Sequence, residues 1–284
     1  MTISRIGVVG AGTMGTGIAQ VCAQSGFEVL WYDAASSALV RAREVVGKGL
    51  QRLVQKNVLT DAGRAEALAR LRDVASLDAL ADADLVIEAV AEDLGIKQTI
   101  FRTLDAIVRE HTVLASNTSS LSITKIGAAT TRPGRVLGMH FMNPVPVMAL
   151  VEIVSGHHTS ADVLARTEDV CRTLGKVPVR AADYPGFIAN RILMPMINEA
   201  CYTLMEGVAS REAIDTVMKL GANHPLGPLA LADLIGLDIC EAILDVLHAG
   251  LGDPKYRACP LLRRMVAAGE LGRKTGRGFY VYAA

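Results

Sequence analysis

The first half of the chain alternates short apolar runs with longer stretches of helical periodicity. Helical patterns begin near Thr13, Ser36 and Leu94, and each follows a run rich in β-branched residues. Continuous apolar strands that alternate with helices are typical of a parallel sheet covered on both faces. The sequence therefore predicts a doubly wound α/β domain with a mostly parallel sheet. The predicted strands lie in "RIGVVG", "FEVLWYD", "DLVIEAV", "TVLASN" and "RVLGMHF".

The strand pattern ends near Tyr184, and the remainder of the chain predicts an all-helical domain. Pro185 and Gly186 in "AADYPGF" interrupt the chain at this point and mark the expected boundary. We therefore expect two domains, residues 1–184 and residues 185–284. Apolar residues recur at helical spacing in "GFIANRILMPMINEACYTLMEGV", "SREAIDTVMKLG" and "PLALADLIGLDICEAILDVLHAG".

Composition excludes several classes of function for this chain of 284 residues. It is 51% hydrophobic and 20% charged, as expected of a globular protein, and its formal net charge is +0. A neutral chain has no long-range field for nucleic acid or an anionic membrane. No apolar run reaches the ~20 residues that cross a bilayer, and the N-terminus lacks a signal-peptide pattern. The five cysteines are scattered without metal-like spacing. We expect a cytoplasmic protein without a metal site.

The motif "GAGTMG" follows the first predicted strand and opens a helix, as in the phosphate-binding loop of Rossmann-type domains. Gly10 permits a tight turn, Gly12 lets the backbone approach a pyrophosphate, and Gly15 allows close helix packing. The helix N-terminus attracts the phosphates. We therefore predict a dinucleotide site in the first domain. The predicted loop residues are Gly10, Ala11, Gly12, Thr13, Met14 and Gly15.

Asp33 ends the second predicted strand, near the distance from the glycines at which an acid binds the adenosine ribose. A carboxylate accepts hydrogen bonds from a ribose 2'-hydroxyl and repels a 2'-phosphate, so the sequence favours NAD over NADP. In the alternative interpretation the glycines only form a turn and Asp33 only caps the following helix.

The segment "GMHFMNPVPVMALVEIV", residues 138–154, has only two titratable side chains, His140 and Glu152. A dehydrogenase needs a base of near-neutral pKa, which histidine provides, and an imidazolium in a dry site needs a counter-charge. The proline-rich connection between them can reverse the chain and place the two residues opposite each other on paired strands. In the alternative interpretation His140 is a core histidine satisfied by a neighbouring acid. The other histidines are assigned no role: His111, His157, His158, His224 and His248.

Hydroxyl and amide side chains add further candidates. Ser119 in "SNTSS" lies just past a predicted strand, where ligands gather in open α/β sheets. For Ser120 or Ser122 the alternative, capping of the helix expected in "SITKIGAA", is nearly as good. Asn190 lies in an apolar helical segment, where a buried amide must find partners, either in a substrate or in a contact between domains.

Several motifs in the same order resemble those of the L-3-hydroxyacyl-CoA dehydrogenase family, in particular its short-chain bacterial branch, the 3-hydroxybutyryl-CoA dehydrogenases. The likeness covers essentially the whole chain. The matching stretches are "GAGTMGTGIAQ", "SNTSSLSITKI", "HFMNPVPVMALVEIV", "PGFIANRIL", "NHPLGPLALADLIGLD" and "GRKTGRGFYVY".

The resemblance implies roles for the central residues. His140 matches the catalytic base of the family, and Glu152 matches the carboxylate partnered with it. Ser119 and Asn190 match polar groups near the reacting oxygen. The chain departs from the family pattern at Met142, where a second aromatic residue is common. This difference concerns local packing rather than the chemistry.

The resemblance also implies residues around the cofactor and the substrate. Glu92, Lys97 and Asn143 match positions near the nicotinamide half of NAD or the thioester arm of the substrate. Lys274 matches a cofactor contact from the C-terminal part of the chain. Lys56 loosely matches a position that binds the coenzyme A moiety.

The resemblance implies reversible, NAD-dependent oxidation of a short-chain (S)-3-hydroxyacyl-CoA, an NAD-binding first domain, and a second domain that binds substrate and forms a homodimer. One alternative is a dehydrogenase of free 3-hydroxy acids. Such enzymes typically use a lysine where the helix expected near Gly186 has Asn190 and Arg191. The other alternative is a non-catalytic NAD-binding or lens-type structural protein, which would not need His140 and Glu152.

Overall fold

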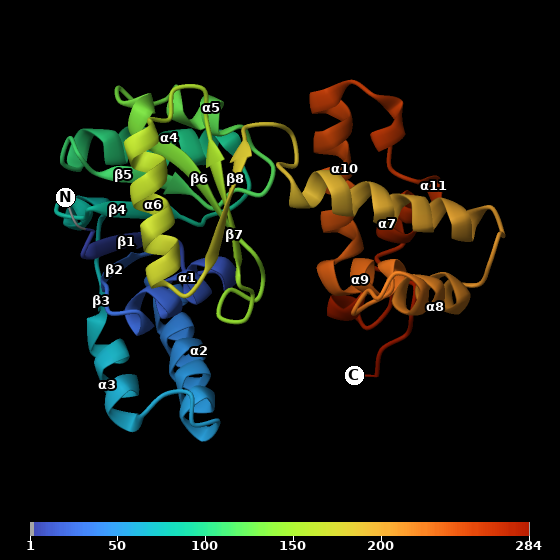
Figure 1. The fold of residues 1–284 in the computed structure, drawn as a ribbon, viewed down its shortest axis with the longest axis horizontal. Helices are drawn as coiled ribbons and strands as arrows, with labels where there is room; N and C mark the ends of the chain where they lie inside the picture. The colour runs from blue at the N-terminus through green and yellow to red at the C-terminus, as the bar shows by residue number, and fades with distance from the viewer. Residues whose placement is uncertain (1–2, 284) are drawn as a thin grey trace. The chain divides into compact units, whose positions relative to one another are not determined.

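The computed structural model describes residues 3–283. The start of the first expected domain, residues 1–2, and the end of the second, residue 284, lie outside the described residues. The chain divides after Tyr184 into two compact units, called here the N-terminal and C-terminal units (Figure 1). Each unit has its own apolar core.

The N-terminal unit is built on a single sheet of eight strands among the residues described. The strand order is β3-β2-β1-β4-β5-β6-β7-β8. All neighbours are parallel except β6 and β7, which are antiparallel. The predicted mostly parallel, doubly wound sheet is therefore confirmed. The strands are β1 Arg5–Val9, β2 Glu28–Tyr32, β3 Leu71–Asp73, β4 Leu85–Glu88, β5 Val113–Ser116, β6 Val136–Phe141, β7 Leu150–Ser155 and β8 Val177–Ala182.

Helices connect these strands and begin where the sequence predicts, at Thr13, Ser36 and Leu94. Helix α1 packs against β1 and β2, α5 packs against β6, and α6 packs against β7 and β8. Helices α2 and α3 extend away from the sheet as a hairpin (Figure 1). The helices are α1 Thr13–Gln24, α2 Ser36–Gln55, α3 Asp61–Arg70, α4 Leu94–Ile107, α5 Ile123–Gly127 and α6 Ala161–Thr173, with short 3₁₀ turns at Leu77–Leu80 and Pro133–Arg135.

The C-terminal unit is helical, as predicted, and apart from helices its described residues, 185–283, have only isolated bridges that join Gly272, Arg277 and Val281. One boundary differs from the expectation, because the first helix begins at Ala189 rather than near Gly186. Gly186 and Phe187 have left-handed φ angles of 75° and 48°, which a helix cannot include. The helices are α7 Ala189–Met205, α8 Arg211–Gly221, α9 Pro228–Ile235, α10 Leu237–Leu251 and α11 Pro260–Ala267, with 3₁₀ turns at Pro254–Tyr256 and Arg273–Thr275.

All five cysteines are buried and free. Burial raises the pKa of four of these thiols, and that of Cys171 rises to about 12. A thiol with a raised pKa stays protonated and unreactive. We call these four the buried thiols: Cys22, Cys171, Cys201 and Cys240.

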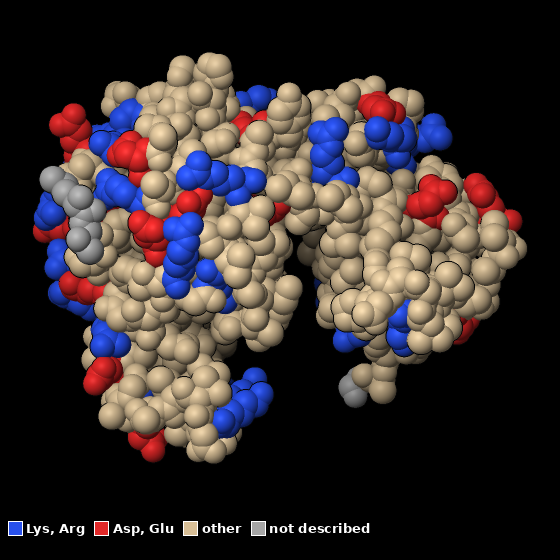
Figure 2. Space-filling model, in the orientation of Figure 1, with Lys and Arg blue, Asp and Glu red and all other residues tan. Residues whose placement is uncertain are grey.

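The surface mixes charges of both signs. On the face seen in Figure 2, Lys and Arg side chains are interspersed with Asp and Glu over both units. None of the helices in the described part of the chain is long and apolar enough to cross a membrane.

Candidate active site

The predicted phosphate loop lies between β1 and α1. Gly10 has a φ of +112°, and a Cβ there would lie 2.5 Å from the carbonyl oxygen of Ala89. A Cβ at Gly15 would lie 2.1 Å from the carbonyl oxygen of Gly10. At Gly12, in contrast, a Cβ would meet nothing within 4 Å. Two positions therefore need glycine so that the loop can close, and the third leaves open space where a pyrophosphate can approach.

The N-terminus of α1 is suited to bind phosphate. Gly12 is its N-cap residue, and no side chain accepts a capping hydrogen bond there. The first helical residues are accessible, since Thr13 is exposed and Met14 is half-buried. Uncapped N–H groups and the helix dipole attract anions. The residues present thus fit the diphosphate of a dinucleotide.

Sequence reasoning missed Trp31, the one tryptophan of the chain. Its side chain is 0% exposed, and its indole N–H donates to the carbonyl oxygen of Gly10 at 2.9 Å. The Gly10 N–H in turn donates to the carbonyl oxygen of Tyr32 at 2.8 Å. Trp31 therefore holds the start of the phosphate loop against β2. An aromatic residue in an apolar strand gives no sequence signal beyond core packing.

Asp33 follows β2 and faces the same loop. One carboxylate oxygen accepts from the N–H of Ala11 at 2.7 Å, and the other accepts from the N–H of Ala35 at 2.8 Å. Ala35 is the N-cap residue of α2, and no side chain accepts a capping hydrogen bond at the start of that helix, so Asp33 holds the chain just before α2 without capping it. Each carboxylate oxygen has a second lone pair, which leaves acceptor capacity for a hydroxyl group. The ribose contact of Asp33 stays a prediction.

His140 and Glu152 form a buried pair, as the sequence predicts. They are direct partners in the antiparallel register of β6 and β7. Nδ1 of His140 lies 2.7 Å from Oε2 of Glu152. The two residues are 7% and 1% exposed, and His140 is the one buried histidine among the six, all of which the structure describes. Both lie near the carboxyl end of β6, which is the end of the sheet where the phosphate loop also lies.

A second charged cluster, missed from the sequence, centres on Glu88 at the end of β4. Glu88 is 0% exposed and accepts from Nζ of Lys97 at 2.6 Å. It also accepts from the N–H of Val90 at 2.7 Å and from the hydroxyl of Ser116 at 2.6 Å. Lys97 is itself 1% exposed. The carboxylate of Glu88 thus fixes a lysine that the sequence assigned to cofactor binding.

Glu92 continues this cluster toward Ser119. Its Oε1 accepts from the hydroxyl of Thr118 at 2.6 Å and from the N–H groups of Ser119 and Ser120 at 2.9 and 3.1 Å. Its Oε2 lies 3.5 Å from Nζ of Lys97. Burial alone would raise the pKa of Glu92, but the charge of Lys97 and these hydrogen bonds outweigh it, so the pKa is lowered. Glu92 is therefore an anion that orients the backbone at Ser119.

The neighbouring polar residues differ in their surroundings. Asn117 accepts from the N–H of Phe141 at 3.0 Å and so ties the end of β5 to the end of β6. Asn143 is exposed in the loop that follows β6. Ser122 is the N-cap of α5 and accepts from the N–H of Lys125, which confirms the capping interpretation for that serine.

Two predicted residues lie in the C-terminal unit. Asn190 is 9% exposed in the first turn of α7. Lys274 is paired with Asp238, with Nζ 2.5 and 2.6 Å from the two carboxylate oxygens. Their roles toward substrate and cofactor stay predictions.

Lys56, the predicted coenzyme A contact, is the C-cap residue of α2 and is exposed. Cationic side chains are visible near this end of the α2–α3 hairpin in Figure 2. The assignment of Lys56 to coenzyme A binding also stays a prediction.

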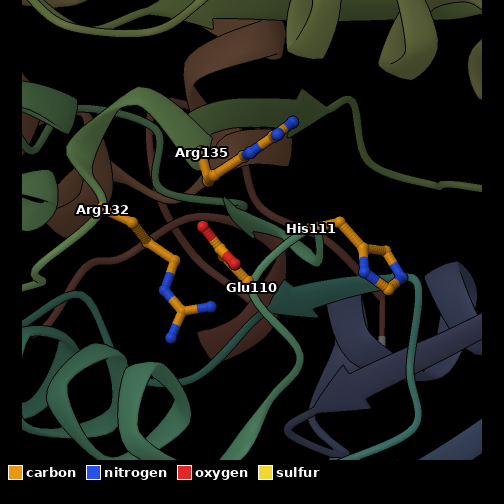
Figure 3. A pocket seen from close by; sticks show the side chains of 4 residues that line it. All are labelled: Glu110, His111, Arg132 and Arg135. Carbon is orange, nitrogen blue, oxygen red and sulfur yellow. The ribbon is translucent and has the colours of Figure 1, made fainter.

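A surface pocket elsewhere is lined by Glu110, His111, Arg132 and Arg135 (Figure 3). These residues immediately precede β5 and β6, so the pocket lies at the amino ends of the strands. Arg132 is already paired there with Asp105, with Nε 2.6 Å from Oδ1. Ligands of α/β sheets bind at the opposite, carboxyl ends. The pocket contains none of the predicted site residues.

Both units match models of known protein families. Residues 5–184 match the model of the 3-hydroxyacyl-CoA dehydrogenase NAD-binding domain, and residues 186–282 match that of the 3-hydroxyacyl-CoA dehydrogenase C-terminal domain. The two matches together cover nearly the whole chain. The cofactor is therefore NAD.

Individual relatives of the chain belong to the same family. The chain is 54% identical to a probable 3-hydroxybutyryl-CoA dehydrogenase of Deinococcus radiodurans, over 98% of this chain and 100% of that one. It is 51% identical to a 3-hydroxybutyryl-CoA dehydrogenase of Bradyrhizobium diazoefficiens, over 99% and 96%. The crystal structure of (S)-3-hydroxybutyryl-CoA dehydrogenase from Ralstonia eutropha has a TM-score of 0.97 at 53% identity and covers 100% of both chains. This chain belongs to the 3-hydroxyacyl-CoA dehydrogenase family and is an NAD-dependent oxidoreductase.

Proposed function

We propose that the protein oxidises (S)-3-hydroxyacyl-CoA thioesters to 3-oxoacyl-CoA thioesters, reversibly, and that it prefers short acyl chains such as 3-hydroxybutanoyl. The names of its relatives support the substrate class. The observation that carries the chemistry is the buried pair of His140 and Glu152, with 2.7 Å between Nδ1 and Oε2.

The pair suits a general base. An ionised carboxylate can only accept a hydrogen bond, so Nδ1 of His140 carries a proton and Nε2 presents a lone pair. In the proposed reaction Nε2 accepts the proton of the 3-hydroxyl group as the alcohol is oxidised. Bound NAD supplies the acceptor for the hydride that leaves C3.

Glu152 and the polar residues support that proton transfer. Glu152 fixes the tautomer of the ring and stabilises the imidazolium that forms. Ser119, whose backbone Glu92 orients, and Asn190 hold the reacting oxygen. Asn143, Lys97 and the phosphate loop bind the cofactor. We also propose a cytoplasmic homodimer that associates through the C-terminal unit, for which sedimentation should give twice the mass of one chain.

Substrate tests separate this proposal from the two alternatives. Purified protein is mixed with NADH and acetoacetyl-CoA, with longer 3-oxoacyl-CoA esters, or with free acetoacetate, and NADH absorbance is followed. We expect turnover of the thioesters, fastest with acetoacetyl-CoA. Turnover of only the free acid would favour a 3-hydroxy acid dehydrogenase.

No turnover of any substrate, with NADH still bound, would favour the non-catalytic alternative. Trp31 contacts the phosphate loop, so quenching of its fluorescence by NADH measures binding independently of catalysis. His140→Ala should lose ~10²- to 10⁴-fold in kcat, the usual effect of removing a general base, and should bind NADH as the wild type does.

A further inference from the structure

Lys176 is a buried cation that the proposed chemistry does not use. It lies directly before β8, is 7% exposed, and its Nζ donates to the carbonyl oxygens of Val145 at 2.6 Å and Met148 at 2.8 Å. Among residues 3–283, no carboxylate lies within ion-pair distance of it. Burial lowers the pKa of this ammonium group. A buried charge is costly unless its desolvation is offset by a partner or by hydrogen bonds, and here two backbone carbonyl groups supply the hydrogen bonds.

Both carbonyl groups belong to residues 142–149, the loop that joins β6 to β7 and therefore His140 to Glu152. We call it the β6–β7 loop. Val147 and Met148 are 75% and 41% exposed, so apolar burial does not hold this part of it. The N–H groups of both residues donate to the carbonyl oxygen of Pro144, each at 3.0 Å.

The other end of the loop contacts the phosphate-binding helix. Val145 is 2% exposed, and a Cβ added to Gly17 of α1 would lie 2.8 Å from the Val145 Cβ. The carbonyl oxygen of Val145 is the one that Lys176 binds at 2.6 Å. The ammonium group of Lys176 thus binds the β6–β7 loop at two places, at the buried Val145 and at the exposed Met148.

We propose that Lys176 is a positioning residue, whose ammonium group fixes the β6–β7 loop and thereby sets the contact between His140 and Glu152 and the position of Asn143. The inference rests on the proposed function of the pair. Hydrogen bonds from a charged donor are stronger than neutral ones, and two of them on one loop restrict its motion. A misplacement of about 1 Å near reacting groups can cost ~10²-fold in rate.

Three substitutions test the role of Lys176. Lys176→Met keeps the length of the side chain and removes its donors, Lys176→Gln keeps a shorter neutral donor, and Lys176→Arg keeps a charged donor for two carbonyl groups. Lys219→Met, on the exposed surface of α8, is the matched control. If Lys176→Met does not fold, the comparison of Gln with Arg carries the test.

Hydrogen exchange and kinetics are measured at a temperature where Trp31 fluorescence shows a folded protein. In Lys176→Met the amides of Val147 and Met148 should exchange faster, kcat should fall ~10- to 100-fold, and NADH affinity should fall less than kcat because the phosphate loop is unchanged. The acidic limb of the pH profile should move to lower pH, as it should in Glu152→Gln. Lys176→Arg should restore most of kcat, and Lys219→Met should match the wild type.

Unchanged amide exchange in Lys176→Met would overturn the proposal, and so would wild-type kcat and an unmoved pH profile despite faster exchange. If the wild type itself turned over no 3-oxoacyl-CoA, the proposed function would fail. The exchange experiment would still decide whether Lys176 fixes the loop.

Discussion

Replacing Lys97 should destabilise the N-terminal unit far more than a surface substitution. Its Nζ lies 2.6 Å from Oε1 of Glu88, and the two side chains are 1% and 0% exposed. Removing one partner of a buried ion pair typically costs about 3–5 kcal/mol, because the other charge stays buried. Glu88 keeps its hydrogen bonds from Val90 and Ser116, so we expect the lower end, about 3 kcal/mol, for Lys97→Met.

The sole tryptophan makes this measurable for the N-terminal unit alone. Trp31 is fully buried there, so its emission reports unfolding of that unit during heating without NADH. For a unit of this size about 1 kcal/mol corresponds to roughly 2–4 °C, so the midpoint should fall by about 6–12 °C. Adding Glu88→Gln should recover part of this loss, since the fully buried carboxylate is then neutral and only the partly exposed Glu92 has lost its ion pair with Lys97.

The control is Lys48→Met on the exposed surface of α2, which should change stability by no more than about 0.5 kcal/mol. The reasoning would be refuted if Lys97→Met lowered the midpoint no more than Lys48→Met. It would also be refuted if adding Glu88→Gln to Lys97→Met lowered the midpoint further, as a second, independent destabilisation would.

Three further predictions concern the cofactor, the substrate and the cysteines. NAD should be preferred over NADP in kcat/KM, and Asp33→Ala should narrow the difference; equal or better kcat/KM with NADPH in the wild type would contradict this. Lys56→Ala should raise KM for acetoacetyl-CoA, more at low salt than at high salt, and an unchanged KM at both would remove Lys56 from the coenzyme A site. The buried thiols should resist iodoacetamide at pH ~8, because their raised pKa keeps them protonated; mass spectrometry showing their rapid alkylation in the folded protein would contradict burial.

The features predicted best from the sequence are those that combine a local rule with a global one. The glycine spacing predicted a loop that closes at Gly10 and stays open at Gly12, because backbone sterics act within a few residues. The contact of His140 with Glu152 was predictable because a proline-rich reversal in an apolar segment leaves few ways to bury two polar side chains. The register of β6 and β7 confirms it.

Other features depend on tertiary contacts that no local pattern reveals. Strand β8 contains Pro178 and Arg180 and lies at an exposed edge, so its sequence lacks the apolar run of the inner strands. Glu88 ends an apolar strand, and its partner Lys97 comes from the next helix. Lys176 looks like an ordinary turn lysine until the β6–β7 loop is seen to fold back on it. The roles of Asn190 and Lys274 depend on ligands and stay predictions.

The central claim is that Glu152 works as the counter-charge of a catalytic base, and the pH dependence of kcat for Glu152→Gln tests it most directly. Glutamine keeps the shape of the side chain and removes the charge that favours the protonated ring of His140. In the oxidation direction the acidic limb should therefore move to lower pH than in the wild type, with a reduced plateau. A Glu152→Gln enzyme with wild-type kcat and an unmoved acidic limb would contradict the account and would leave His140 as a core histidine satisfied by its neighbour.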